Sequence, residues 1–520
     1  MRFSGLLTVL VGCGGGPVAN YTLELVPVTA SNQSPFQGLS RLELVVEPAA
    51  GDSIRYELGD VSSGDNAKLE GMPELEGATL ALEGYASGEL VSFGRSEAID
   101  LRRGEATVQL LVAEVDGFAW LERLTDDNFQ GAVAPDGAGS FYLFGGSGSS
   151  ALIGSNDAQD GVWVLDVAPP DALRFEKVGS MPDLADDAGT PGRMGHTATL
   201  LTGSHGHQGK ILVAGGTNAY QDCQYASASA FLWNPQTDEA ESLGSSDPMV
   251  NRHFMHSAVE DSGGSVVLAG GFTYTSTENS ILWSQSIEIF NPSSGSFAKA
   301  SGTASGPLLH HGSARLGTEG VLHCGGVDLT VSLDVKGSVA CDLVTVSGNV
   351  QSAESLPERL VGPAMAPLPD GRVLVTGGLA VGTEDEGLSY DVNATTDATD
   401  EAWITDGSSW EAVGGMVYPR AFHQALPLPD GRVLLVGGAT SGDLLYLIDM
   451  DALDCAEIFD PDSGTFSEVG SCNSNPPLPN TVVLPAVASD PDYGVLVVGG
   501  QDGVWNPVDG AALFVGAPDL

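Results

Sequence analysis

The sequence predicts an all-β protein, namely a seven-bladed β-propeller preceded by a small β-sandwich of immunoglobulin or transthyretin type. Glycine makes up 69 of 520 residues, about twice its usual share, which is typical of turn-rich β structure. Few helical periodicities occur, and no apolar run reaches the length of a membrane-spanning helix. A short apolar run that ends in two glycines recurs at intervals of 52 to 70 residues, and the second glycine of each pair is Gly146, Gly216, Gly271, Gly326, Gly378, Gly438 or Gly500.

Residues 1–19 have the pattern of a lipoprotein signal followed by a glycine-rich tether. Arg2 supplies a minimal basic region, Leu6–Val11 a short apolar core, and Leu10–Cys13 reads LVGC. This run resembles a bacterial lipobox, whose cysteine is acylated and becomes the new N-terminus. The resemblance implies that Cys13 is lipidated and, because Gly14 follows it, that the protein reaches the outer membrane. The alternative is an ordinary buried strand with a chance cysteine.

Residues 20–116 are predicted to form the β-sandwich. The segments Tyr21–Val28, Arg41–Pro48, Thr79–Ala86 and Ala106–Val115 alternate apolar and polar residues and are separated by Gly, Ser and Asp turns. No motif in this part carries chemistry. We expect it to hold the propeller away from the membrane or to assist binding.

The sixth glycine-pair unit shows the repeat most completely. Ala421–Leu428 reads as a strand, Leu428–Gly431 as a tight turn, and Arg432–Val436 as a short strand buried on both faces. The two glycines follow, at a strand end where a Cβ would block close backbone approach. Ala456–Asp460 and Thr465–Val469 then form a hairpin across a PDSG turn. Each unit is therefore predicted to be four antiparallel strands.

Residues 117–520 contain seven such units, and together they predict the propeller. One four-stranded unit cannot bury both of its faces, whereas seven arranged radially can. The strand–Gly–Gly ending, the Arg or His upstream and the hairpin downstream resemble the kelch-repeat family. The tryptophan usual in the fourth strand of that family is present at Trp410 but is Phe297 and Phe466 in other units.

The seventh unit lacks its fourth strand, since Ala511–Gly516 is the last strand of the chain. Phe118–Leu124, just before the first unit, is predicted to supply it. A ring closed by strands from both ends leaves no exposed edge. The alternative is that Phe118–Leu124 is a linker.

Four cysteines are predicted to form two disulfides. Cys324 and Cys341 lie on neighbouring strands of unit four, Cys455 and Cys472 flank the hairpin of unit six, and each pair is 17 residues apart. Both bridges require an oxidising compartment, which agrees with export. Cys223 is left over as an expected free thiol. The alternative is that all five of these cysteines are reduced and packed.

The charge of the chain restricts its partners. Asp and Glu number 68 against 20 Lys and Arg, a formal net charge of −48. Such a surface argues against nucleic acid and against anionic lipid as partners, so membrane contact is expected through the lipid anchor alone. The acidic residues are spread along the chain, and no calcium loop of strict spacing is found.

Four histidines occupy similar places in the first strands of four units: His196, His256, His311 and His423. A metal bound by a ring of histidines is conceivable, but recurrence at one repeat position favours packing or hydrogen bonding. His205 and His207 are too few for a zinc site. Some kelch propellers are copper enzymes that use a tyrosine–cysteine pair, and no such set is matched here. We therefore expect no metal and no cofactor.

The loops after the glycine pairs are long and variable, whereas the first turns are tight. These loops and the residues that precede the first strands emerge on one face, where a rigid scaffold tends to carry function. Arginines and aromatic residues are typical of binding hot spots. The residues predicted to bind are Arg193, Arg252, Arg420, Tyr220, Tyr225, Phe272, Tyr274, Tyr390 and Tyr446. The alternative, favoured for any single residue, is that the rings pack back onto the blades and the arginines pair with carboxylates.

These patterns predict a lipid-anchored binding or scaffolding protein at the cell surface that recognises a glycan or peptide through the propeller face. No Gly-x-Ser-x-Gly, phosphate-loop or His-Glu-x-x-His motif is present, so no catalytic residue is named. The alternative is a carbohydrate-active oxidase or hydrolase in the same setting.

Overall fold

The computed structural model describes residues 7–9, 21–58, 67–70, 75–101, 104–148, 158–168, 173–184, 192–218, 226–244, 248–275, 280–329, 335–380, 395–443, 450–472, 474–504 and 506–518. Within these residues every regular element is a β-strand, which confirms the predicted all-β class. No described segment is a helix long and apolar enough to cross a membrane.

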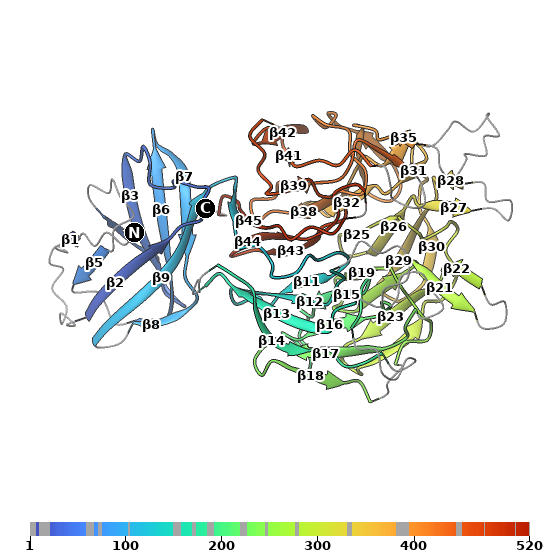
Figure 1. The fold of residues 1–520 in the computed structure, drawn as a ribbon, viewed down its shortest axis with the longest axis horizontal. Coiled ribbons are helices and arrows are strands. Elements are labelled where there is room, and N and C mark those ends of the chain that lie inside the picture. Colours follow the sequence, from blue (N-terminus) through green and yellow to red (C-terminus); the bar gives the residue numbers. More distant parts are fainter. Residues whose placement is uncertain are drawn as a thin grey trace.

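The N-terminal strands form one continuous sheet that folds over its own core (Figure 1). Their order is β1-β5-β2-β9-β7-β6-β3-β4, with β8 on β6. Leu44 of β3, Leu69 of β5 and Leu110 of β9 share one apolar core although β3 and β5 lie far apart in that order. The strands are β1 (Leu7–Val9), β2 (Tyr21–Val28), β3 (Arg41–Glu47), β4 (Ile54–Glu57), β5 (Ala67–Glu70), β6 (Leu75–Ala86), β7 (Glu89–Arg95), β8 (Ile99–Leu101) and β9 (Gly104–Glu114).

Strand β1 lies inside the segment that resembles a lipoprotein signal. Leu7–Val9 pairs in parallel with Ala67–Leu69 of β5. This is the arrangement expected from the alternative interpretation of the segment as an ordinary strand. The lipidation of Cys13 stays a prediction, because Cys13 lies outside the described residues.

Seven four-stranded antiparallel sheets form the propeller, as predicted (Figure 1). From blade one to blade six, the strands in order from the axis outward are β11 (Ala132–Pro135), β12 (Ser140–Phe144), β13 (Gly161–Asp166), β14 (Glu176–Ser180); β15 (Thr197–Leu200), β16 (Ile211–Ala214), β17 (Ala230–Asn234), β18 (Glu239–Ser242); β19 (Ser257–Glu260), β20 (Val266–Ala269), β23 (Ile287–Asn291), β24 (Ser296–Lys299); β25 (Gly312–Leu316), β26 (Gly320–Cys324), β29 (Cys341–Thr345), β30 (Val350–Ser352); β32 (Ala364–Pro367), β33 (Val373–Thr376), β36 (Ala402–Thr405), β37 (Trp410–Ala412); and β38 (Gln424–Pro427), β39 (Val433–Val436), β41 (Ala456–Asp460), β42 (Thr465–Val469).

Blade seven closes the ring as predicted. It combines β43 (Ala486–Asp490), β44 (Gly494–Val498) and β45 (Ala511–Val515) with β10 (Gly117–Trp120) from before blade one. Strand β10 pairs antiparallel with β45, Gly117 opposite Val515. The residues of the predicted closing segment beyond Trp120 are not part of this strand.

The glycine pairs join each blade to the next. In all seven blades the N–H of the second glycine donates to a backbone carbonyl that precedes the first strand of the next blade, for example Gly271 to Leu308 at 2.7 Å. Both glycines of every pair have positive φ. A Cβ on the first glycine, such as Gly270, would overlap that same carbonyl oxygen. The pair is therefore glycine because two backbones meet there, as predicted.

Short two-stranded ribbons extend the loops that follow the glycine pairs, and they lie at the end of the propeller away from the N-terminal sheet (Figure 1). One of them, β35 with β40, joins the loops of blades five and six. The strands are β21 (Phe272–Thr275), β22 (Ser280–Trp283), β27 (Val327–Leu329), β28 (Val335–Gly337), β31 (Leu360–Val361), β34 (Leu379–Ala380), β35 (Thr395–Asp397) and β40 (Ser441–Asp443).

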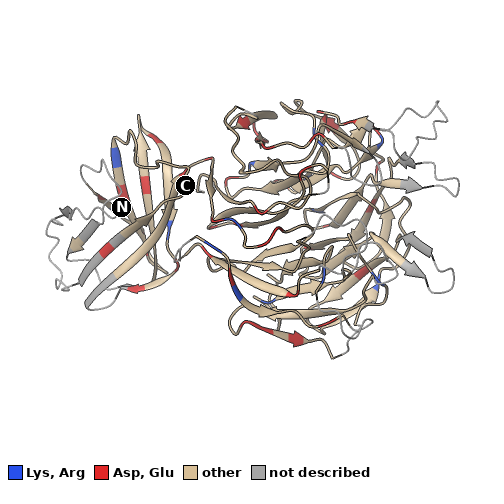
Figure 2. Ribbon diagram, viewed as in Figure 1, with Lys and Arg blue, Asp and Glu red and all other residues tan. Residues whose placement is uncertain are grey.

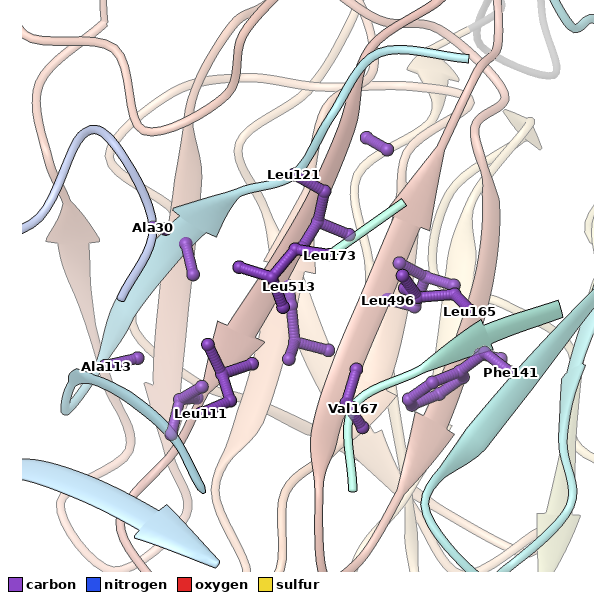
Figure 3. Packing of buried hydrophobic residues seen from close by; sticks show 14 of the residues in the cluster. Ala30, Leu111, Ala113, Leu121, Phe141, Leu165, Val167, Leu173, Leu496 and Leu513 are labelled. Carbon is purple, nitrogen blue, oxygen red and sulfur yellow. The ribbon is translucent and has the colours of Figure 1, made fainter. Parts of the chain in front are cut away.

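The N-terminal sheet contacts the opposite end, where the turns between first and second strands lie. Arg432, beside the turn of blade six, donates to both carboxylate oxygens of Asp116 at 2.8 and 2.7 Å. Arg95 of β7 pairs with Asp492 in the turn of blade seven at 3.0 Å. Figure 3 shows Leu111 of β9 beside Leu513 of blade seven in one shared apolar core. The sheet and the closing blade are thus joined by charge and by packing.

Both predicted disulfides form. Cys324 and Cys341 are directly opposite on β26 and β29, with Cα atoms 4.2 Å apart. Cys455 and Cys472 flank the hairpin of β41 and β42, with Cα atoms 5.0 Å apart. Two disulfides indicate an oxidising environment outside the cytosol.

Candidate functional site

A cavity of about 400 Å³ lies on the propeller axis. Its wall is built from the beginnings of the innermost strands, among them β19, β25, β32 and β38. The residues that line it include no Asp, Glu, Lys or Arg. Although Asp and Glu lie on both parts of the molecule (Figure 2), the cavity itself holds only uncharged polar and apolar groups.

One residue per blade, just before the innermost strand, has a left-handed backbone. We call these seven residues the collar: Gln130, Gly195, Met255, His310, Gly362, Phe422 and Leu484, with φ between 51° and 67°. Neighbouring collar residues are hydrogen bonded between blades, for example Met255 N–H to Gly195 carbonyl and Phe422 N–H to Gly362 carbonyl, both at 2.8 Å. For a non-glycine residue this conformation costs about 1–2 kcal/mol, so five of the seven are strained.

The collar side chains meet across the axis. The rings of His310 and Phe422 form an edge contact with centroids 5.3 Å apart. Gln130 Nε2 donates to Met255 Sδ at 3.4 Å. Phe422, Met255 and Leu484 belong to one apolar cluster. These contacts make an apolar floor between the cavity and the loop end of the propeller.

The cavity therefore opens toward the turn end. It extends from the collar along the first strands as far as Val259 of β19. Every residue of β19, whose first three residues line the cavity, is partly exposed. The open end is the end on which the N-terminal sheet sits.

The accessible polar groups of the wall are concentrated on blades three and four. Ser257, His310, His311 and Ser313 are all half-buried and line the cavity. Ser257 Oγ lies 3.1 Å from His311 Nε2, and Ser313 Oγ donates to Ser257 Oγ at 3.0 Å. Ser313 Oγ also lies 2.8 Å from His323 Nδ1. These hydroxyls and imidazoles form one hydrogen-bonded network across two blades.

Burial keeps the histidines of this wall neutral. It lowers the pKa of His310 and the pKa of His311 to about 4. In His310 the neighbouring His311 lowers the pKa further, and in His311 a hydrogen bond with the backbone of Leu308 opposes the effect of burial. At neutral pH both rings therefore offer one donor and one acceptor each. A base with so low a pKa is poorly matched to proton abstraction at neutral pH.

The other three histidines of the predicted set are buried in the blades. His256 Nε2 is bonded to Thr197 Oγ1 at 3.1 Å, and His423 Nε2 to Thr376 Oγ1 at 2.8 Å. His196 is also buried. Burial lowers the pKa of all three rings well below the usual value. Packing and hydrogen bonding were the roles favoured from the sequence, and these contacts agree with them.

The histidines do not converge on a point. Among the described residues, three His, Cys, Asp or Glu ligand atoms lie within 4.8 Å of one another only at Asp454, Cys455 and Cys472. Two of these residues form a disulfide. The described part of the channel therefore presents hydrogen-bonding groups without a preformed metal-binding set.

Two of the predicted binding arginines are structural instead. Arg193 and Arg420 are buried, and each donates to the first glycine of its own blade's pair, Arg193 to Gly215 at 3.0 Å and Arg420 to Gly437 at 2.8 Å. Arg420 also pairs with buried Glu457 at 2.6 Å. Burial lowers the pKa of Arg193 to about 9. Neither side chain is available to a ligand at the surface, so direct binding by these two residues is corrected to support of the glycine pair.

Of the remaining predicted residues, three are described, and they lie toward the loop end. Arg252 is half-buried and donates to the carbonyl of Ala226 at 3.1 Å. Phe272 stacks on Phe254 with ring centroids 6.0 Å apart. Tyr274 lies in β21. Tyr220, Tyr225, Tyr390 and Tyr446, like Cys223, lie outside the described residues.

Sequence reasoning missed the collar and the serines. The sequence expectation was one continuous strand over Ala421–Leu428, whereas Phe422 interrupts it and β38 begins at Gln424. The signal was present: a bulky residue stands directly before His256, His311 and His423, two residues after the position that supports the glycine pair. Ser257 directly follows one of the predicted histidines, so the repeat alignment also pointed to the wall.

Comparisons with known proteins bear on the fold of this chain and identify no family for it. No family model and no curated protein matches the chain. A solved structure of the protein YjhT shares 15% identity over 67% of this chain and 99% of its own, with a TM-score of 0.45. A fungal alcohol oxidase of the AA5 family, solved in complex with copper, shares 16% identity over 77% of this chain and 76% of its own, with a TM-score of 0.53. At this identity the likeness to the oxidase structure supports the fold alone.

Proposed function

We propose that the protein is an exported, lipid-anchored binding or scaffolding module at the cell surface, which holds part of a glycan or peptide at the end of the propeller channel. The observation that supports this most is the axial cavity of about 400 Å³, lined by hydroxyl, imidazole and amide groups over an apolar floor. This volume lies within the usual range of ligand sites, and a few polar groups in an apolar setting are their usual composition.

The chemistry of the cavity favours binding over catalysis. Burial keeps His310 and His311 neutral at pH 7 by lowering the pKa of each, and none of the described lining residues is a carboxylate that could orient them. A binding site needs only donors and acceptors of fixed geometry, which Ser257, Ser313 and His311 provide through their mutual hydrogen bonds.

Export is supported by two features that are independent of the cavity. Both disulfides belong to an oxidising compartment. The net charge of −48 keeps the protein off anionic lipid surfaces, so an acyl chain on Cys13 would hold it at the membrane without surface adsorption. Metabolic labelling with a fatty-acid analogue should mark the wild type and leave Cys13→Ser unlabelled.

The binding function is tested on arrays. The soluble form, residues 20–520, is applied to printed glycans and peptides, and each hit is measured by calorimetry. The double variant Ser257→Ala, Ser313→Ala should weaken binding at least tenfold, because it removes both accessible hydroxyls of the wall. Ser347→Ala, at an exposed turn, is the matched control and should bind as wild type. Binding that survives the double variant would contradict the proposal. Stoichiometric copper in the purified protein would favour an oxidase instead.

A further inference from the structure

The collar contains bulky residues where glycine would be free of strain. Met255, His310, Phe422 and Leu484 have φ of 55°, 53°, 55° and 51°. Long side chains rarely adopt this region, because their Cβ crowds the following carbonyl. Residues in such conformations tend to cluster at functional sites, where the surrounding structure holds them in place.

Two blades have glycine at the collar position because a side chain would not fit there. A Cβ on Gly362 would lie 2.5 Å from the ring of Phe422, and one on Gly195 would overlap the ring of Phe254. Glycine thus stands where a neighbouring aromatic ring already occupies the space. At the other five positions the side chain itself reaches the axis and lines the cavity.

The side chains that reach the axis make an amphipathic floor. Phe422, Met255 and Leu484 give an apolar surface, and His310 and Gln130 border it with hydrogen-bonding groups. A ligand on this floor meets no formal charge from the described lining residues. Because an unpaired ion is costly to bury, such a site rejects charged ligands.

We propose, on the basis of the binding function above, that the collar is the specificity-determining floor of the site and that it selects an uncharged sugar ring entering from the turn end. One face of a sugar ring carries C–H groups that suit Met255 and Leu484, which line the cavity and are half-buried. Its hydroxyls match the donors and acceptors of His310 and Ser257. An extended peptide is the weaker candidate, because the closed floor prevents a chain from threading through the channel.

The first experiment varies the charge of the sugar ligand while its ring stays the same. The full-length protein is titrated calorimetrically with neutral hexoses (glucose, galactose and mannose), with the matching uronates and with the matching amino sugars at pH 6. At least one neutral hexose should bind ten times more tightly than its uronate and its amino sugar. Equal or tighter binding of the charged forms, or no binding of any neutral hexose, would overturn the proposal.

The second experiment separates specificity from stability. Leu484→Gly removes a collar side chain, and Leu173→Gly is the matched control, since Leu173 has φ of 50° but lies in the core between the domains. Both variants relieve the same backbone conformation. Leu484→Gly should weaken the neutral hexose at least tenfold or change which hexose is preferred, while Leu173→Gly keeps the wild-type preference. If both variants change hexose binding in the same way, the collar has only a structural role.

The failures of the two proposals can be told apart. If peptides alone bind, and the wall variants Ser257→Ala and Ser313→Ala abolish that binding, the binding function stands and the sugar assignment falls. If no ligand responds to those wall variants, the binding function itself falls.

Discussion

Replacement of the first glycine of a pair should separate two blades. Gly270 has φ of 72°, and a Cβ there would overlap the carbonyl oxygen of Leu308 in the next blade. That carbonyl accepts the N–H of Gly271 at 2.7 Å. Gly464 has φ of 66° with nothing within 4 Å of its Cβ, so Gly464→Ala carries the conformational cost without the clash.

The two costs can be compared. Gly464→Ala should lower the free energy of unfolding by about 1 kcal/mol. This is the penalty for alanine in the left-handed region, partly offset because alanine has less conformational entropy than glycine in the unfolded chain. Gly270→Ala adds a lost hydrogen bond at about 1 kcal/mol and disturbed packing between blades, in total about 3–5 kcal/mol.

Urea unfolding monitored by tryptophan fluorescence measures both variants, with the midpoint compared at constant m-value. Gly270→Ala should unfold at a clearly lower urea concentration than Gly464→Ala. Equal losses would refute the argument that the glycine pair exists for close backbone approach, and would leave positive φ as its whole explanation.

Three further predictions concern the core and the charge. Burial lowers the pKa of His310 and of His311 from 6.5 to about 4, so below pH 6.5 the unfolded chain binds protons that the folded protein excludes. The free energy of unfolding should therefore be fully present above pH 6.5 and fall as the pH drops toward 4, by at most about 3 kcal/mol for each ring. Unfolding curves recorded in acid measure this loss. Glu457→Gln leaves Arg420 buried without its counter-charge and should cost about 3–5 kcal/mol in urea unfolding, whereas a loss below 1 kcal/mol would contradict the structural role of that arginine. Cys324→Ser should cost about 3 kcal/mol in non-reducing buffer, and reductant should destabilise this variant less than the wild type, because only the Cys455–Cys472 bridge is left to reduce; equal stability of variant and wild type without reductant would mean that the Cys324–Cys341 bridge is absent in solution.

The repeat made most of the fold predictable. The hairpin of β41 and β42 has the bounds expected from its alternation and its PDSG turn. The ring closure followed from a missing strand at one end and a spare one at the other. These features are local, or they follow from counting strands, so the sequence carries them directly.

The path of the chain between blades was not predictable in the same way. Phe422 reads as part of a strand, because Ala421–Leu428 is apolar and β-compatible. Its left-handed conformation is imposed by backbone hydrogen bonds to neighbouring blades, and those contacts exist only in the assembled ring. A local pattern cannot report them.

The burial of two predicted binding arginines escaped the sequence for a related reason. An arginine before a strand reads as exposed, yet the carbonyl of Gly437 and the carboxylate of Glu457 draw Arg420 inside the blade. The sequence cannot show that the collar closes the loop end, so it could not place the cavity at the turn end.

The central claim is that the cavity on the turn side of the collar is the binding site, and a single-site labelling experiment tests it directly. Ala258→Cys places a thiol on the cavity wall without removing a polar group, and its alkylation rate is followed by peptide mass spectrometry with and without the array ligand of highest affinity. A small reagent should label this thiol in the free protein, and the bound ligand should slow the labelling at least tenfold. A labelling rate that the bound ligand leaves unchanged would place the binding site elsewhere.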